Sequence, residues 1–153
     1  MRAIRSATRD DTDACAAVLA RAFQNDPGTV LYEPDATRRA EILPQFFHTF
    51  IAASLDEGAQ LVVAGDPING VAIWFGPEQH GPSQDALGAN GFEDVLDASG
   101  PEASQRLQAM VGELEAQHER LADGTHLRLD FFGVDPVGQG SGSKAGGTQR
   151  AVV

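Results

Sequence analysis

Short apolar runs and longer stripes of apolar residues at helical spacing alternate along most of the chain. Four of the runs are too short for typical helices and are rich in the aliphatic, β-branched and aromatic residues that favour strands. These runs are residues 3–7, 61–64, 71–75 and 127–134. A Gly/Asn/Pro turn separates the second run from the third, which predicts a β-hairpin with a loop longer than two residues. The alternation predicts an α/β domain with a mixed sheet and helices on both of its faces.

Two helices are predicted between the first strand and the hairpin. Thr8 and Asp11 form a capping box, whose side chains can bond the unpaired N–H groups at a helix start, and an apolar stripe at helical spacing follows. Asp35 can cap the second helix, and Gly58 should end it. Pro44 lies inside this second pattern, so it should kink the helix or begin its main segment.

A third helix is predicted after the hairpin. Residues 25–34 and 76–91 are rich in polar residues, Gly and Pro, and we interpret both as loops. The third helix opens near Pro101 and should end near Gly124. Its apolar stripe has spacings of 4, 3, 4 and 3 residues and consists of Leu107, Val111, Leu114, His118 and Leu121.

Composition and charge narrow the function. A chain of 153 residues with 42% hydrophobic and 22% charged residues is typical of a soluble single domain. A formal charge of −11 argues against nucleic acid or an anionic membrane as a partner, because both require neutralised phosphates. A single cysteine, Cys15, excludes an internal disulfide and suits the cytoplasm. Without a signal peptide or a long apolar segment, we expect a cytoplasmic protein that is not embedded in a membrane.

Glycines follow the last predicted strand at positions 138, 140 and 142. Backbone N–H groups in such a loop can converge on an anion, so the strand and loop suit a ligand that carries phosphate. A Walker loop is excluded because Ser143-Lys144-Ala145 replaces the required Gly-Lys-Ser/Thr. A dinucleotide fingerprint needs an acidic residue about twenty positions further on, and only eight residues follow Ala145.

The sequence resembles the GNAT superfamily of N-acetyltransferases at both ends. Val134-Asp135-Pro136 followed by Gln139-Gly140-Ser141-Gly142 resembles the strand and pyrophosphate loop of that family, whose loop reads Gln/Arg-x-x-Gly-x-Gly/Ala. Lys144 stands where Gly or Ala is usual. The opening Ile-Arg-x-Ala-Thr-x-Asp-Asp at residues 4–11 is also similar to the start of a GNAT domain. The order strand, helix, helix, hairpin, strand agrees with the family, whose sheet is mixed and mainly antiparallel.

The resemblance implies that acetyl-CoA is the acyl donor and that the acceptor is a primary amine of a small molecule or a peptide. It also implies that the pantetheine arm pairs with the main chain of Phe132, Gly133 and Val134. The pyrophosphate would be held by the loop amides of Gln139, Gly140, Ser141, Gly142, Ser143 and Lys144. In this architecture the second helix lies beside the acceptor, so its phenylalanines could line that site or simply pack on the sheet.

Transfer to an amine needs a base that removes a proton from the ammonium. Strand alternation places His126, Arg128 and Asp130 on one face. Carboxylates that act as the base often lie on this strand in the family, so Asp130 is the first candidate, although it could instead pair with Arg128. His118, on the third helix, is the second candidate or a hydrogen-bonded core histidine, and His126 is the third. The remaining histidines show no matching partner, so the sequence indicates no metal site.

Two features depart from the family. Residues 76–125 form a probable insertion between the strands, and residues 145–153 lack the apolar stripe of the helix that should follow the loop. We therefore interpret residues 1–144 as a partial GNAT-like domain, incomplete at its C-terminus, followed by an irregular tail. The alternative function is a non-catalytic acyl-CoA-binding remnant or interaction module.

Two expectations follow for residues 127–134. A strand inside the sheet supports an acyl-CoA site, and an edge position would remove that argument. A missing C-terminal neighbour predicts unpaired main-chain groups and an exposed apolar face. Such a chain should turn over slowly, and it should form a homodimer or recruit a partner that covers the edge.

Overall fold

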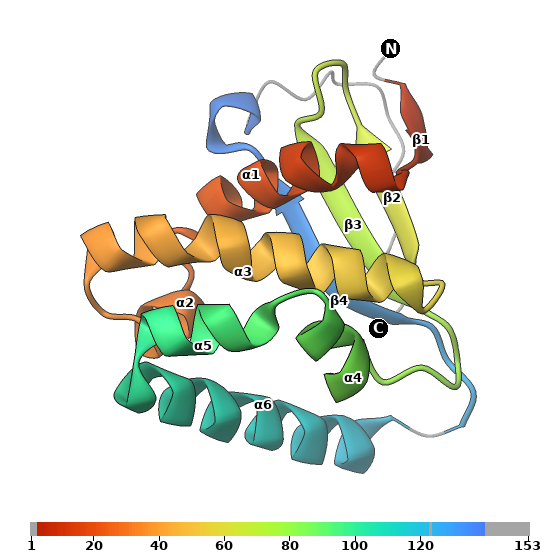
Figure 1. Cartoon of the computed structure of the whole chain (residues 1–153). Helices are drawn as coiled ribbons and strands as arrows, with labels where there is room; N and C mark the ends of the chain where they lie inside the picture. Colours follow the sequence, from red (N-terminus) through yellow and green to blue (C-terminus); the bar gives the residue numbers. More distant parts are fainter. Residues whose placement is uncertain (1–2, 123, 140–153) are drawn as a thin grey trace.

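The computed structural model describes residues 3–122 and 124–139, and the described part contains one antiparallel sheet in the order β1-β2-β3-β4 (Figure 1). The strands are β1 (Ile4–Ser6), β2 (Gln60–Ala64), β3 (Gly70–Phe75) and β4 (Arg128–Val134). The helices are α1 (Thr12–Phe23), α2 (Pro27–Tyr32), α3 (Ala36–Asp56), α4 (Gln84–Ala89), α5 (Phe92–Ser99) and α6 (Pro101–Leu121). Short 3-10 turns, Arg9–Asp11 and Pro136–Gly138, precede α1 and follow β4. All four predicted strands and the predicted α/β class are confirmed, and the sheet that we expected to be mixed has only antiparallel pairs among the described residues.

The main core lies between the sheet and the two helices α1 and α3 (Figure 1). Ile73 pairs with Leu61 on one side and with Phe131 on the other, so these three side chains share the face that α1 and α3 cover. The rings of Phe47 and Phe50 in α3 meet the Phe131 ring at centroid distances of 5.2 and 5.1 Å. Burial of this face joins the sheet to both helices.

The described helices after the hairpin do not form a layer on the second face, which is where we expected one. Instead, α4 and α5 pack on α3, and α6 packs on α5 and α2. Val95 of α5, Leu107 of α6 and Tyr32 of α2 are buried together in a second cluster with Ile42 of α3. The segment between β3 and β4 therefore buries its apolar residues against the outer side of α3.

Both predicted caps are confirmed. The Thr8 N–H donates to an Asp11 carboxylate oxygen at 2.8 Å, and this capping box opens the short turn that leads into α1. One Asp35 oxygen accepts from the N–H groups of Thr37 and Arg38, both at 2.9 Å. The helix α3 runs through Pro44, which therefore does not begin a separate segment.

Two regions that we interpreted as loops contain helices. Asp26 accepts a hydrogen bond from the Gly28 N–H at 2.8 Å, and Pro27 occupies the first helical position of α2, where its missing N–H costs nothing. Ser83 caps α4 by accepting from the Ala86 N–H at 3.2 Å. Gly and Pro lie at or just before the starts of these helices. The helices themselves are too short for a helical spacing of apolar residues to be recognised in the sequence.

The stripe predicted on α6 is buried only in its first part. Leu107 is 6% exposed, whereas Val111, Leu114 and Leu121 are 47%, 56% and 83% exposed. The reason is that α6 meets α2 and α5 through its first turns and then extends past them. Within residues 3–122 and 124–139, no helix combines the length and the apolar character needed to cross a bilayer.

The strand β4 lies at the edge of the described sheet, beside β3. We expected residues 127–134 inside the sheet, so the argument from a central strand does not hold. We also expected an exposed apolar face here, and Leu127, Leu129 and Phe132 are 65%, 37% and 63% exposed.

Candidate functional site

Five polar side chains gather where α6 ends and β4 begins, and we name them the α6–β4 cluster: Glu115, His118, His126, Arg128 and Asp130. The Arg128 guanidinium lies at its centre. Its Nε donates to Asp130 Oδ1, and its Nη2 donates to Glu115 Oε1 at 2.9 Å. The cluster thus brings together the three catalytic candidates that the sequence identified.

A β-bulge positions Asp130. Ile73 pairs with Phe131 and Trp74 pairs with Leu129, so Asp130 is an extra residue on β4 without a cross-strand partner. A bulge turns the extra side chain away from strict alternation, and bulges are common next to active sites. The Asp130 side chain is 10% exposed and lies near Gly81, which is in the segment between β3 and α4.

Burial raises the pKa of Asp130, because the charged carboxylate is removed from water, and the neighbouring Arg128 partly opposes this shift. Burial also opposes the charge of Arg128, but its bonds to Glu115 and Asp130 outweigh that effect and raise the pKa of the guanidinium. The Arg128 Nη1 is buried and has no hydrogen-bond partner among the described residues. An oxygen of a ligand or a water could satisfy this donor.

The two histidines of the cluster face each other. His118 Nε2 and His126 Nε2 are 3.1 Å apart, and the rings are tilted by 51°. His126 Nδ1 lies 2.9 Å from the Gly124 carbonyl oxygen, which can only accept, so Nδ1 carries a hydrogen. In a neutral His126, Nε2 therefore carries a lone pair, which points at His118.

The predicted acyl-CoA residues on β4 have different surroundings. Phe132 is exposed on the face away from α1 and α3, and Gly133 is pressed against α1. A Cβ at position 133 would lie 2.7 Å from Leu19 Cδ2, so the glycine permits close packing of strand on helix. The Val134 carbonyl accepts from the Gln139 side-chain amide at 3.0 Å.

The start of the glycine loop is held by its own hydrogen bonds. The N–H groups of Val137 and Gly138 donate to Asp135 at 3.1 and 2.7 Å, and that of Gln139 donates to Pro136 at 3.3 Å. Asp135 also binds Arg21 of α1 at 2.6 Å, which holds its pKa below the usual value. Gly140, Ser141, Gly142, Ser143 and Lys144 lie outside the described residues, so their phosphate role remains a prediction.

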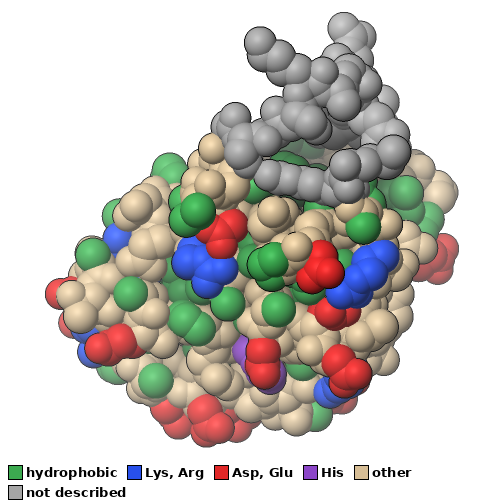
Figure 2. All heavy atoms as spheres, turned by 90° about the horizontal axis from the view of Figure 1, so that it is seen from above, with side chains coloured by type: hydrophobic (Ala, Val, Ile, Leu, Met, Phe, Trp, Pro, Cys, Tyr) green, Lys and Arg blue, Asp and Glu red, His purple; other side chains and the backbone are tan. Residues whose placement is uncertain are grey.

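Ion pairs of this kind tie distant segments together. In Figure 2, the face seen from above carries basic side chains (blue) directly beside acidic ones (red). Arg9, in the turn before α1, binds Asp56 at the end of α3 in the same way. Each pair uses one acidic and one basic group, so the formal net charge of −11 is unchanged by them.

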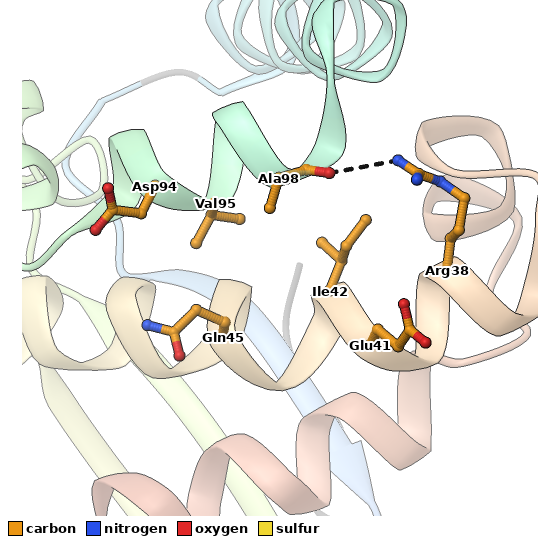
Figure 3. A pocket seen from close by; sticks show the side chains of 7 residues that line it. All are labelled: Arg38, Glu41, Ile42, Gln45, Asp94, Val95 and Ala98. Atoms are coloured by element: carbon orange, nitrogen blue, oxygen red, sulfur yellow. Dashed lines mark hydrogen bonds between the residues drawn. The ribbon is translucent and has the colours of Figure 1, made fainter.

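The phenylalanines of α3 pack in the core rather than in a pocket. Phe47 is fully buried, and Phe46 contacts Phe92 of α5 at a centroid distance of 5.6 Å. A pocket of about 370 Å³ lies between α3 and α5. Figure 3 shows Glu41 and Asp94 around Ile42 and Val95 in this pocket. Arg38 spans one end by donating to the Ala98 carbonyl at 3.4 Å.

A second pocket of about 360 Å³ is lined by His48. The Nδ1 atom of His48 lies 2.8 Å from Asp13 Oδ1. The two residues lie on α3 and α1, so no local pattern could have indicated the pair. Neither pocket is lined by a residue of the α6–β4 cluster.

Comparison with known proteins rests on structure alone. No family model matches the sequence, and no curated protein matches it. The fold is similar to a crystal structure described as histone acetyltransferase HPA2 and related acetyltransferase from Corynebacterium glutamicum ATCC 13032. The TM-score is 0.56 at 19% sequence identity, and the match covers 91% of this chain and 63% of that chain. The chain therefore has an acetyltransferase fold over most of its length, and it spans less than two thirds of its neighbour.

Proposed function

We propose that this chain belongs to an acetyltransferase that moves an acetyl group from acetyl-CoA to a primary amine of a small molecule or peptide. The observation that carries the proposal is the likeness of 91% of the chain to an acetyltransferase structure. The acidic balance of the chain supports an acceptor that carries a positive charge before it reacts. The GNAT-like loop sequence at residues 139–142 supports a donor with a pyrophosphate.

Asp130 is the proton acceptor in this proposal. Asp130 first takes one proton from the ammonium, and its raised pKa makes it a stronger base than an exposed aspartate. The neutral amine nitrogen then attacks the thioester carbonyl carbon, and the C–S bond breaks with its electron pair going to the thiolate. The thiolate takes up the second proton from the nitrogen as the amide forms. Arg128 holds the carboxylate in place, and its buried Nη1 can donate to an oxygen of the bound substrate.

The edge strand β4 has two alternative uses in the proposal. On the side where no described strand pairs with it, its main chain can offer groups to an extended ligand with amide groups, such as a pantetheine arm. In the alternative, a second copy of the chain covers this edge and the exposed Leu129 and Phe132 in a homodimer, which would exclude the ligand from the same groups. A dimer would appear as a doubled mass by light scattering, and Phe132→Asp should shift it to monomer.

The test measures CoA release from acetyl-CoA with a panel of amines. We expect Asp130→Asn to lower kcat about 10²–10⁴-fold, the usual contribution of a general base. Asp94→Asn, an exposed carboxylate on α5, is the matched control and should leave turnover unchanged. A role for Asp130 in turnover also requires the low-pH limb of the rate profile to disappear in the asparagine variant.

Isothermal titration with CoA separates the donor site from the chemistry. A bulky residue in place of Gly140 or Gly142 should weaken CoA binding much more than Asp130→Ala does, because a base acts on the transition state. CoA binding without turnover on any amine would favour the non-catalytic acyl-CoA-binding module. Absence of both binding and turnover would overturn the proposal.

A further inference from the structure

The geometry of the two histidines in the α6–β4 cluster points to a metal site that bridges the end of α6 and the start of β4. We propose that His118 and His126 bind one divalent cation of the zinc class, through Nε2 of each ring. The proposed transfer reaction uses Asp130 and gives neither imidazole a role. The inference is therefore independent of the acetyltransferase function.

The two rings converge as ligands of one ion converge. Imidazole nitrogens bind zinc at about 2.05 Å, so two nitrogens 3.1 Å apart subtend roughly 98° at a shared ion. Each ring centroid lies about 1.1 Å behind its nitrogen, which gives a centroid separation of roughly 4.8 Å for that arrangement. The observed separation is 4.9 Å. In the absence of an ion, His118 Nε2–H can donate a hydrogen bond to His126 Nε2 across the same 3.1 Å, so an ion bound by both nitrogens would replace that bond and release its proton.

The surroundings of His126 favour the same conclusion. Ligating histidines usually donate the second ring N–H to a carbonyl or a carboxylate, which fixes the tautomer and aims the other nitrogen. His126 Nδ1 makes this bond to the Gly124 carbonyl at 2.9 Å. Gly124 has a positive φ of 76°, so the turn that presents this carbonyl favours glycine at that position.

The charges of the cluster also suit a cation. Glu115 lies one turn before His118 on α6, and Asp130 lies two residues beyond Arg128 on β4. Both carboxylates contact the Arg128 guanidinium. The formal charges of Glu115, Asp130 and Arg128 add up to one negative charge beside the two rings. Arg128 occupies both carboxylates, and no group of three or more His, Cys, Asp or Glu side chains within the described residues is arranged to hold a metal.

The site is thus a pair of imidazoles, and its other positions would take water or a donor atom of an incoming ligand. Imidazole suits Zn²⁺, Ni²⁺ and Cu²⁺ better than it suits Mg²⁺ or Ca²⁺. The two ligands are eight residues apart, with His118 on α6 and His126 in the segment before β4. An ion held by both would fasten the exposed second half of α6 to the strand that carries Asp130.

The experiment titrates ZnCl₂ into the untagged chain in a non-chelating buffer and follows binding by calorimetry. We expect one equivalent to bind and the melting temperature to rise, because the ion binds the folded form. His118→Asn and His126→Asn should each weaken binding at least about tenfold, since even indirect supports of a metal site cost that much. His48→Asn and His80→Asn are matched controls and should bind as the wild type does.

Histidine ring resonances give a second measurement that does not depend on affinity or activity. Added Zn²⁺ should shift the ring signals of His118 and His126 and leave those of His48 and His80 in place. Circular dichroism checks that both asparagine variants are folded. Absence of binding, binding that survives both substitutions, or equal loss in the His48 control would each overturn the metal site.

Discussion

Gly133 offers the sharpest test of how β4 packs, because a single methyl group meets α1 there. A Cβ at position 133 would lie 2.7 Å from Leu19 Cδ2 and 3.0 Å from Ala22 Cβ. Carbon atoms prefer separations of about 3.5–4.0 Å, so roughly 1 Å of space is missing. Leu19 is fully buried and cannot move into solvent. The prediction is therefore that Gly133→Ala destabilises the fold.

The magnitude follows from two opposing effects. Overpacking of a core costs about 1–3 kcal/mol. Replacing glycine by alanine restricts the unfolded chain and returns about 0.4–1 kcal/mol. The net loss is then about 1–2 kcal/mol, and the melting temperature should fall by roughly 2–8 °C for a chain of this size.

The assay is urea unfolding followed by circular dichroism, with Gly112→Ala as the matched control. Gly112 lies inside α6, and a Cβ there would meet nothing within 4 Å. That variant should be stabilised by about 0.5–1 kcal/mol, because alanine is the better helix former. The two identical substitutions should thus change stability in opposite directions.

A double-mutant cycle with Leu19→Ala locates the clash. Alone, Leu19→Ala should cost about 2–5 kcal/mol through the cavity it leaves. In the Gly133→Ala background it should cost less, because the new methyl group then has room. If Gly133→Ala is as stable as the wild type while the Gly112 control behaves as expected, β4 does not lie this close to α1.

Three further predictions concern the rest of the fold. Arg5 binds Asp11 and holds the pKa of that carboxyl below its unfolded value of about 3.9. The stability from this pair is therefore present above about pH 4 and is lost as the pH falls further, so Asp11→Asn should flatten the acid-induced drop of the urea midpoint. Burial raises the pKa of the Cys15 thiol to about 11, and we expect an aromatic disulfide reagent at pH 8 to modify it only after unfolding. Ser99→Ala should cost about 1–3 kcal/mol by leaving the buried Tyr32 hydroxyl without its partner, and adding Tyr32→Phe should recover part of that loss in thermal unfolding.

The ion pairs of the α6–β4 cluster depend on a β-bulge and on a neighbouring helix, which strand alternation alone does not predict. Alternation predicted that His126, Arg128 and Asp130 share one face, but the bulge interrupts it, because Leu129 pairs with Trp74 and Phe131 pairs with Ile73. The bulge at Asp130 and the contact of β4 with Glu115 of α6 then added the ion pairs that raise the pKa of Arg128. The pairing of Asp130 with Arg128, which the sequence left open, is present in the structure, and a catalytic role for Asp130 remains to be measured.

The sequence by itself determined the elements whose signals are local. The strands followed from short runs of β-branched and aromatic residues, and the helix starts followed from Thr8, Asp35 and Pro101. These signals are local because a cap or a strand pattern acts within a few residues of itself. The short helices α2 and α4 were missed because six residues are too few to show a helical period, although Asp26 and Ser83 were available as caps.

The tertiary structure alone decided which faces are buried and which polar groups meet. The stripe on α6 predicts a core helix, yet Leu114 and Leu121 are exposed because no described element lies over them. His48 meets Asp13 from another helix, and His118 meets His126 across a turn. The edge position of β4 likewise depends on which strands pair with it. Such contacts arise from surfaces that come together only when the chain folds, and no short stretch of sequence records its distant partner.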